Sequence, residues 1–301
     1  MENLRGALLM MLSMAGFALE DALVKSVAGR IPMGEVLLFL GCGGALAFGL
    51  LANRQGHCLT SRLVFHRAVM LRNLFEMLGT ASFVTALALI PLSLNSAIFQ
   101  ATPLFVTLGA IVFLGARVGW RRWAAIAVGL AGVLIILRPG FEGFEPAALV
   151  SVLAALALSG RDLAIRACPP EAHPLQLSAW GFMAIIPVGL AMLALSGGPV
   201  RPSGTEALML GGAVGLAMLG YYALTLAMQL GEVAFVTPFR YIRLVYGIGL
   251  GWLVFSERPD APMLIGSAIV VGAGLYALWR ERRTAANRPF QSPAARARRQ
   301  A

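Results

Sequence analysis

Two arginines that are three residues apart, Arg240 and Arg243, lie in a long apolar stretch of the sequence. Residues three apart share one face of a helix, so both guanidinium groups point the same way. Pro238, just before them, removes a backbone hydrogen bond and opens a helix locally. Tyr241 and Tyr246 add phenolic hydroxyls nearby. Because a guanidinium grips a carboxylate through two parallel hydrogen bonds, this stretch predicts a site that binds an anionic group of a substrate.

The same arginines have a second interpretation. They could pair with acidic side chains of the chain itself and hold one conformation closed. The acids available in other apolar stretches are Glu20, Asp21 and Asp162. The sequence leaves both interpretations open.

Two further charge pairs occur at helical spacing. Asp21 and Lys25 are four residues apart, as are Arg72 and Glu76, so each pair shares a helix face. Each pair could neutralise itself and only hold helices together. The alternative is that Arg72 contacts the substrate, while Asp21, Lys25, Glu76 and Asp162 take part in coupling or gating.

Two uncharged polar side chains are also candidates for substrate binding. Gln100 lies deep in an apolar stretch, where it could line a permeation path or join two helices through hydrogen bonds. Trp180 lies in another such stretch and could stack on a substrate ring. No metal-ligand spacing and no cofactor motif occurs, so the sequence predicts neither a metal nor a cofactor.

The elements that position these residues are predicted to be transmembrane helices. Of 301 residues, 58% are hydrophobic and only 13% are charged, with a mean hydropathy of +0.79. A helix needs roughly 20 apolar residues to cross the hydrocarbon core. Ten such segments run near 6–27, 33–52, 70–90, 92–114, 122–138, 146–166, 175–196, 205–229, 233–255 and 261–280. The sequence therefore predicts an all-α polytopic membrane protein with ten transmembrane helices.

The distribution of basic residues predicts the orientation. With the N-terminus in the cytoplasm, fifteen arginines fall in inner loops and four in outer loops. We therefore expect both termini in the cytoplasm of a bacterium, with the chain in the inner membrane. The net charge of +10 is then a topology signal, and no nucleic-acid partner is expected.

The chain also repeats itself. A shift of 141 residues places the stretch from Asp21 to Lys25 on the stretch from Asp162 to Arg166. Five helices per half is an odd number, so the two halves cross the membrane in opposite directions. We expect a first repeat at 1–140, a second at 141–282 and a basic, disordered cytoplasmic tail at 283–301.

Several short motifs resemble the drug/metabolite transporter superfamily, in particular its EamA-type ten-helix members. They are Leu71-Arg72-Asn73, the run at 86–92, Ala101-Thr102-Pro103-Leu104 and the Phe255-Ser256-Glu257-Arg258-Pro259 ending. The resemblance covers residues 5 to about 282 and implies a transporter of two inverted five-helix repeats. Ala116 stands where the family often has the glutamate that survives in the second half as Glu257, which favours a structural role for Glu257.

The charges inside the apolar segments predict the class of solute. Five cations face five acids there, and a balanced site suits a zwitterion such as an amino acid, or an organic anion that moves with a proton. We expect a secondary transporter of an amino-acid-like or carboxylated solute, facilitative or proton-coupled, that works by alternating access. Its partners are the solute and membrane lipid, and the sequence leaves open whether two copies form a homodimer.

Two functions from other classes remain as alternatives. An intramembrane enzyme for lipid-linked substrates would need a catalytic dyad or metal ligands at one depth, and the sequence has neither. A scaffold or sensor that transports nothing would gain no function from charges that recur in both halves.

Overall fold

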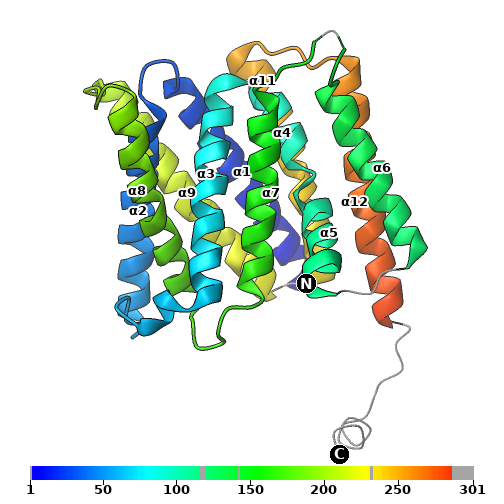
Figure 1. Ribbon diagram of the computed structural model, residues 1–301, viewed down its shortest axis with the longest axis horizontal. Helices are drawn as coiled ribbons and strands as arrows, with labels where there is room; N and C mark the ends of the chain where they lie inside the picture. The colour runs from blue at the N-terminus through cyan, green and yellow to red at the C-terminus, as the bar shows by residue number, and fades with distance from the viewer. Residues whose placement is uncertain (1, 116–118, 142, 231–232, 287–301) are drawn as a thin grey trace, which may run out of the picture.

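The computed structural model describes residues 2–115, 119–141, 143–230 and 233–286, and every regular element within these ranges is a helix (Figure 1). The elements are α1 (Glu2–Val27), α2 (Met33–Arg54), η1 (Arg62–Phe65), α3 (Arg67–Leu89), α4 (Leu92–Phe99), α5 (Thr102–Leu114), α6 (Trp120–Leu137), α7 (Ala148–Ile165), α8 (Pro174–Leu195), α9 (Gly204–Leu230), α10 (Val233–Val236), η2 (Thr237–Tyr241), α11 (Ile242–Phe255) and α12 (Ala261–Ala286). The helices stand side by side in one bundle, and α1 begins at the edge where α12 ends (Figure 1). The all-α prediction is confirmed for the described residues.

The predicted apolar segments coincide with the helices. In the described part of the chain, eight helical runs are long and apolar enough to cross a membrane. The two other predicted segments correspond to α3 and to the run α10–η2–α11. Neither is among the eight: the run α10–η2–α11 consists of short helices, and α3 contains the charged residues Arg72 and Glu76. α12 continues to Ala286, so the predicted tail begins as helix, and its remaining residues, 287–301, lie outside the described ranges.

Local chemistry explains several helix ends. α2 and α4 begin directly after Pro32 and Pro91, whose fixed φ and missing N–H suit a helix start. α5 ends at Gly115, whose φ of 63° is the left-handed conformation that glycine adopts without strain. One predicted segment ends at residue 90 and the next begins at 92, and the structure places this break at Pro91.

Helices from the first part of the chain pack on helices from the second part. The principal pairs are α1 with α9, α2 with α8, α3 with α7, α4 with α11 and α6 with α12. Glycine allows the closest approaches: a Cβ at Gly132 of α6 would lie 2.9 Å from the carbonyl oxygen of Gly266 in α12. The two parts therefore form one interlocked bundle.

Two helical runs are interrupted at equivalent positions. The first run breaks between α4 and α5, where Gln100 ends α4. The second changes to a 3₁₀ turn at η2, which contains Pro238 and ends at Tyr241. Gln100 and Tyr241 are 141 residues apart, which is the offset of the repeat predicted from the sequence. Interrupted helices at matching positions are the usual indicator of a transporter's binding site.

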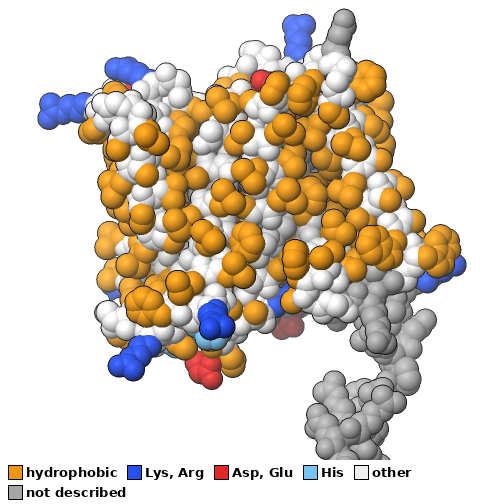
Figure 2. Space-filling model, viewed as in Figure 1, with side chains coloured by type: hydrophobic (Ala, Val, Ile, Leu, Met, Phe, Trp, Pro, Cys, Tyr) orange, Lys and Arg blue, Asp and Glu red, His pale blue; other side chains and the backbone are white. Residues whose placement is uncertain are grey.

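The outer surface fits a lipid environment. Figure 2 shows hydrophobic side chains across the middle of the visible face, whereas its Lys and Arg side chains lie towards the upper and lower edges. Large apolar side chains such as Leu46, Phe113 and Leu219 are mostly exposed, at 73%, 81% and 65%. In water such a surface would be costly, so the chain is a multi-pass membrane protein.

Candidate functional site

Arg243 and Asp21 form a buried ion pair between α11 and α1. Arg243 Nη2 donates to Asp21 Oδ2 at 2.7 Å, and the two side chains are only 16% and 6% exposed. The interpretation that an arginine of this stretch pairs with an acid of the chain is therefore confirmed for Arg243.

Three aromatic rings surround the same guanidinium. The Arg243 Cζ atom lies 5.5 Å from the ring centroid of Phe17, 5.5 Å from that of Phe83 and 5.1 Å from that of Phe99. These rings come from α1, α3 and the end of α4, beside the interruption in that run. A cation over aromatic faces is attracted by the ring quadrupoles, so the rings and Asp21 together fix Arg243 in place.

Arg240 lies one turn before Arg243, in η2, and is placed differently. Its side chain is exposed, and within the described ranges it makes no ion pair or hydrogen bond. The charged groups that act on it are Asp162, Arg161 and Arg243. Arg240 is therefore a cation inside a charged neighbourhood with its donors available to a ligand.

Glu20 is the acidic counterpart of Arg240. It is half-buried in α1 next to Asp21, and the charges that act on it are Asp21 and Arg243. Among the described residues it has no ion-pair or hydrogen-bond partner. Glu20 and Arg240 thus leave one carboxylate and one guanidinium without a partner in the described ranges, and Arg243 acts on both of them.

A second group of charges lies between α3 and α7. Arg72 Nη2 is 2.8 Å from Glu76 Oε2, and Arg161 Nη1 is 3.1 Å from Glu76 Oε1. Arg161 Nη2 also lies 2.8 Å from Asp162 Oδ1. The predicted Arg72–Glu76 pair is confirmed, and Glu76 links it to α7. In this group every charge has a partner.

Lys25 is not paired with Asp21, so the interpretation that these two charges neutralise each other is wrong. Lys25 Nζ donates to the carbonyl oxygens of Leu87 and Ile90 at 3.2 and 2.6 Å, and lies 3.9 Å from Glu257 Oε1. The physical reason is that carbonyls at the end of α3 have no intrahelical donors and attract a cation. Asp21 is then left for Arg243.

Glu257 caps the start of α4. Its carboxylate accepts from the backbone N–H of Leu92 at 2.7 Å, from that of Ser93 at 2.9 Å, and from the Ser93 hydroxyl at 2.7 Å. The first N–H groups of a helix lack partners, and a carboxylate there is favourable. This is the structural role expected for Glu257, and it ties the end of α11 to α4 with Lys25 close by.

Tyr241 and Tyr246 lie on different sides of their helical run. Tyr241 is buried with its hydroxyl against Gly274 of α12, where any larger residue would collide with it. Tyr246 packs with Met10 and Met14 of α1. The two tyrosine rings therefore contact different helices, although the sequence predicts both hydroxyls beside the arginines.

Gln100 and Trp180 occupy buried positions. Gln100 is the C-cap of α4, directly after Phe99, and is 7% exposed. Trp180 is 3% exposed, and its indole N–H donates to the carbonyl oxygen of Leu59 at 2.9 Å. Trp180 thus anchors the connection between α2 and α3, far along the chain from the arginine stretch.

Sequence reasoning did not identify the rings of Phe17, Phe83 and Phe99. The sequence contains 16 phenylalanines, and nothing in the spacing of these three marks them. Only Phe99 carried a usable signal, because it adjoins Gln100 at the interruption of its run. In the described ranges no group of His, Cys, Asp and Glu could hold a metal ion.

Comparisons with known proteins give a consistent result. The model of the EamA-like transporter family matches residues 4–138 and again residues 145–279. A riboflavin transporter of Rhizobium johnstonii is 31% identical and covers 92% of both chains. The pseudopaline exporter CntI of Pseudomonas aeruginosa strain UCBPP-PA14 is 30% identical over 89% of this chain and 94% of its own.

Two more distant matches extend this result. An S-adenosylmethionine uptake transporter of Rickettsia felis is 26% identical over 91% of this chain and 92% of its own. A solved crystal structure with 20% identity superposes with a TM-score of 0.60 over 94% of this chain and 99% of its own, which supports the fold alone.

Proposed function

The chain belongs to the EamA-like transporter family, and we propose that it carries an amino-acid-like or carboxylated solute across the bacterial inner membrane by alternating access. Family membership and the named relatives establish the coarser activity, which is transport of a small metabolite and not an enzymatic reaction. The solute class and the mechanism are our inference.

One observation carries the solute class: Arg240 and Glu20 are charged, accessible at least in part, and unpaired in the described chain. Both lie in the electrostatic field of Arg243. A charge inside a membrane protein is costly unless it meets a partner or water, so such charges mark a solute pathway. Arg240 would receive the carboxylate and Glu20 the ammonium group of a zwitterion.

The similarities are compatible with this class. S-adenosylmethionine, which gives one relative its name, is an amino-acid derivative with a carboxylate and an ammonium group. This relative covers nearly the whole chain, so a related solute would use the same bundle.

The proposed mechanism rests on two inverted repeats, 1–140 and 141–282, with ten spans and both termini in the cytoplasm. The double match of the family model and the interruptions at Gln100 and Tyr241 support this arrangement. Asp21 and Asp162 occupy equivalent positions in the two repeats, and each is held by an arginine. We assign them to gating, since exchanging arginine partners would switch the side that is open.

A second solute class has its own support. The rings of Phe17, Phe83 and Phe99 around Arg243 could receive a planar ring system, and the riboflavin transporter of R. johnstonii is 31% identical. A flat solute without a carboxylate would depend on these rings and not on Arg240.

Uptake into proteoliposomes separates the two classes. The panel consists of labelled amino acids, S-adenosylmethionine, dicarboxylates and riboflavin, each with and without a pH gradient. We expect uptake of at least one carboxylated solute, and a fall of about tenfold or more in Arg240→Gln. Arg201→Gln, a matched change at an exposed arginine outside the spans, should leave uptake unchanged. Uptake of riboflavin alone, insensitive to Arg240→Gln, would refute the carboxylate site.

A further inference from the structure

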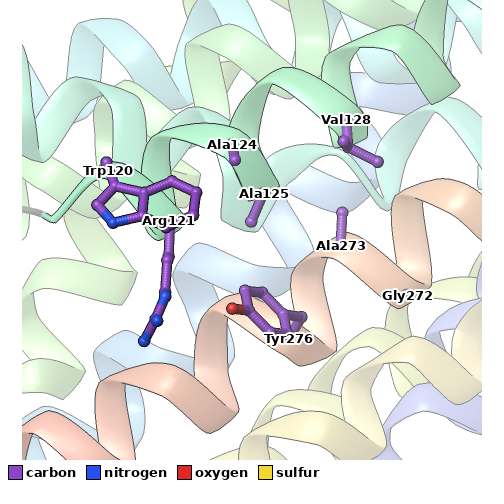
Figure 3. A pocket seen from close by; sticks show the side chains of 8 residues that line it. All are labelled: Trp120, Arg121, Ala124, Ala125, Val128, Gly272, Ala273 and Tyr276. Carbon is purple, nitrogen blue, oxygen red and sulfur yellow. The ribbon is translucent and has the colours of Figure 1, made fainter.

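A pocket lies at the edge of the bundle, between α6 and α12, away from the charged interior (Figures 1 and 3). Its volume is about 400 Å³, within the range of pockets that bind small molecules. Small and apolar residues of both helices form its body, among them Ala125, Val128 and Gly272. An interior this apolar suits a hydrocarbon chain and offers nothing to a polar solute.

One end of the pocket has a different character. Trp120, Arg121 and Tyr276 line it, as Figure 3 shows. Trp120 is 74% exposed and lies under the Arg121 guanidinium, with 5.4 Å between the Cζ atom and the ring centroid. Tyr276 is 40% exposed and lies 5.8 Å from the ring of Trp279. Exposed Trp and Tyr rings concentrate at the headgroup level of a membrane, so this end lies near the lipid headgroups.

Positive charge accumulates at the same end. Arg122 follows Arg121 in the first turn of α6, and Arg280 lies one turn after Tyr276 in α12. No acidic side chain is among the described residues that line the pocket. A basic pocket between transmembrane helices is the usual site for an anionic lipid headgroup, and an arginine binds a phosphate through two hydrogen bonds.

We propose that the groove between α6 and α12 binds one anionic phospholipid, with an acyl chain along Ala125, Val128 and Gly272 and its phosphate on Arg121. The apolar body, the aromatic ring pair at the rim and the positive charge each match one part of that molecule. This inference is independent of the transported solute, because every residue that lines the groove lies in α6 or α12, whereas Arg240 and Glu20 lie in η2 and α1.

Gly272 provides a variant that blocks the groove without disturbing the fold. A Cβ at Gly272 would meet no atom within 4 Å, so Gly272→Leu fills the pocket and not the helix interface. Gly211 in α9 is equally open and exposed but does not line the pocket, which makes Gly211→Leu the matched control. Arg121→Gln removes the proposed phosphate contact.

The test is native mass spectrometry of the purified full chain titrated with phosphatidylglycerol or phosphatidylcholine. Wild type and Gly211→Leu should retain one phosphatidylglycerol with a preference of about tenfold over phosphatidylcholine. Gly272→Leu should lose binding of both lipids, and Arg121→Gln should lose the preference. Equal retention of both lipids by wild type would overturn the proposal, as would unchanged binding in Gly272→Leu. A dimer that dissociates in Gly272→Leu without any change in bound lipid would also overturn it, because the groove would then contact a second copy.

Discussion

Two groups of charged side chains lie inside the bundle, one between α3 and α7 and the other around α1 and α11, and they differ in how their charges are balanced. In the first group, Arg72, Glu76, Arg161 and Asp162 form a continuous chain of ion pairs. In the second, Asp21 and Arg243 pair, and Glu20 next to them has no partner in the described chain. Arg240 has no partner there either, and it lies in the field of both groups, since Asp162 and Arg161 act on it as well as Arg243.

The difference separates charges that already have a partner from charges that a solute could still bind. A network in which each charge has an opposite charge beside it stabilises helix packing, and a ligand would have to displace one of these partners to bind there. Unpaired charges destabilise a membrane protein unless a ligand or water meets them, so they persist only where function requires them. We therefore propose that the solute binds in the α1–α11 region, and single substitutions can test this comparison.

The largest effect is expected from Arg243→Gln. This change leaves Asp21 as a buried, unpaired carboxylate, which costs about 3–5 kcal/mol of unfolding free energy, and it removes a group of the proposed site. Thermal unfolding in detergent and solute uptake should both fall. The double variant Asp21→Asn, Arg243→Gln should recover stability without uptake. A stable, active Arg243→Gln protein would show that the ion pair has neither role.

Glu76→Gln should affect stability but not uptake per folded molecule. It leaves Arg72 and Arg161 facing each other without their shared carboxylate, at a cost of about 3 kcal/mol. Unfolding temperature and uptake normalised to folded protein measure the two effects separately. Lost uptake at unchanged stability would instead assign Glu76 to coupling, as the sequence allowed.

Glu257→Gln should have an intermediate effect. The amide keeps one acceptor oxygen for the start of α4 but loses the charge that faces Lys25, so we expect a loss of about 1–2 kcal/mol. Denaturant or thermal unfolding measures it, with Glu2→Gln at the exposed start of α1 as a control. A change no larger than the control's would mean that the cap contributes nothing.

The smallest effect is a pH dependence at the start of α8, outside the membrane spans. His173 Nδ1 accepts from the backbone N–H of Leu175 at 3.3 Å, and the His57 ring stacks on it at 3.9 Å. Burial, and then the charge of His57, hold the pKa of His173 below its usual value. A lowered pKa means that this stability is present above about pH 6.5 and is lost as the pH falls through the folded-state pKa.

The variant His173→Asn checks this prediction. Asparagine caps a helix without titrating, so the variant should show a weaker fall of unfolding temperature between neutral and acidic pH. An identical pH profile in wild type and variant would contradict the assignment.

The positions of the helices were predictable from the sequence, and the partners of the charges were not. Each predicted segment matches a helix or helical run within a few residues, because apolar length and Pro or Gly boundaries are local signals. The Arg72–Glu76 pair was also predictable, since it lies within one helix. Spacing alone suggested an Asp21–Lys25 pair as well. In the structure Asp21 pairs with Arg243 and Lys25 lies beside Glu257, both more than 200 residues away in the sequence. Which charges pair across helices depends on how the helices pack, and helix packing cannot be read from a single sequence.

The measurement that tests the central claim most directly is equilibrium binding of a transported solute and of its neutral amide to purified wild type and Arg240→Gln. If Arg240 receives the carboxylate, wild type should prefer the acid over the amide by about tenfold or more, and Arg240→Gln should bind the two about equally. An Arg240→Gln protein that still distinguishes acid from amide as wild type does would contradict the account, because the carboxylate would then bind elsewhere.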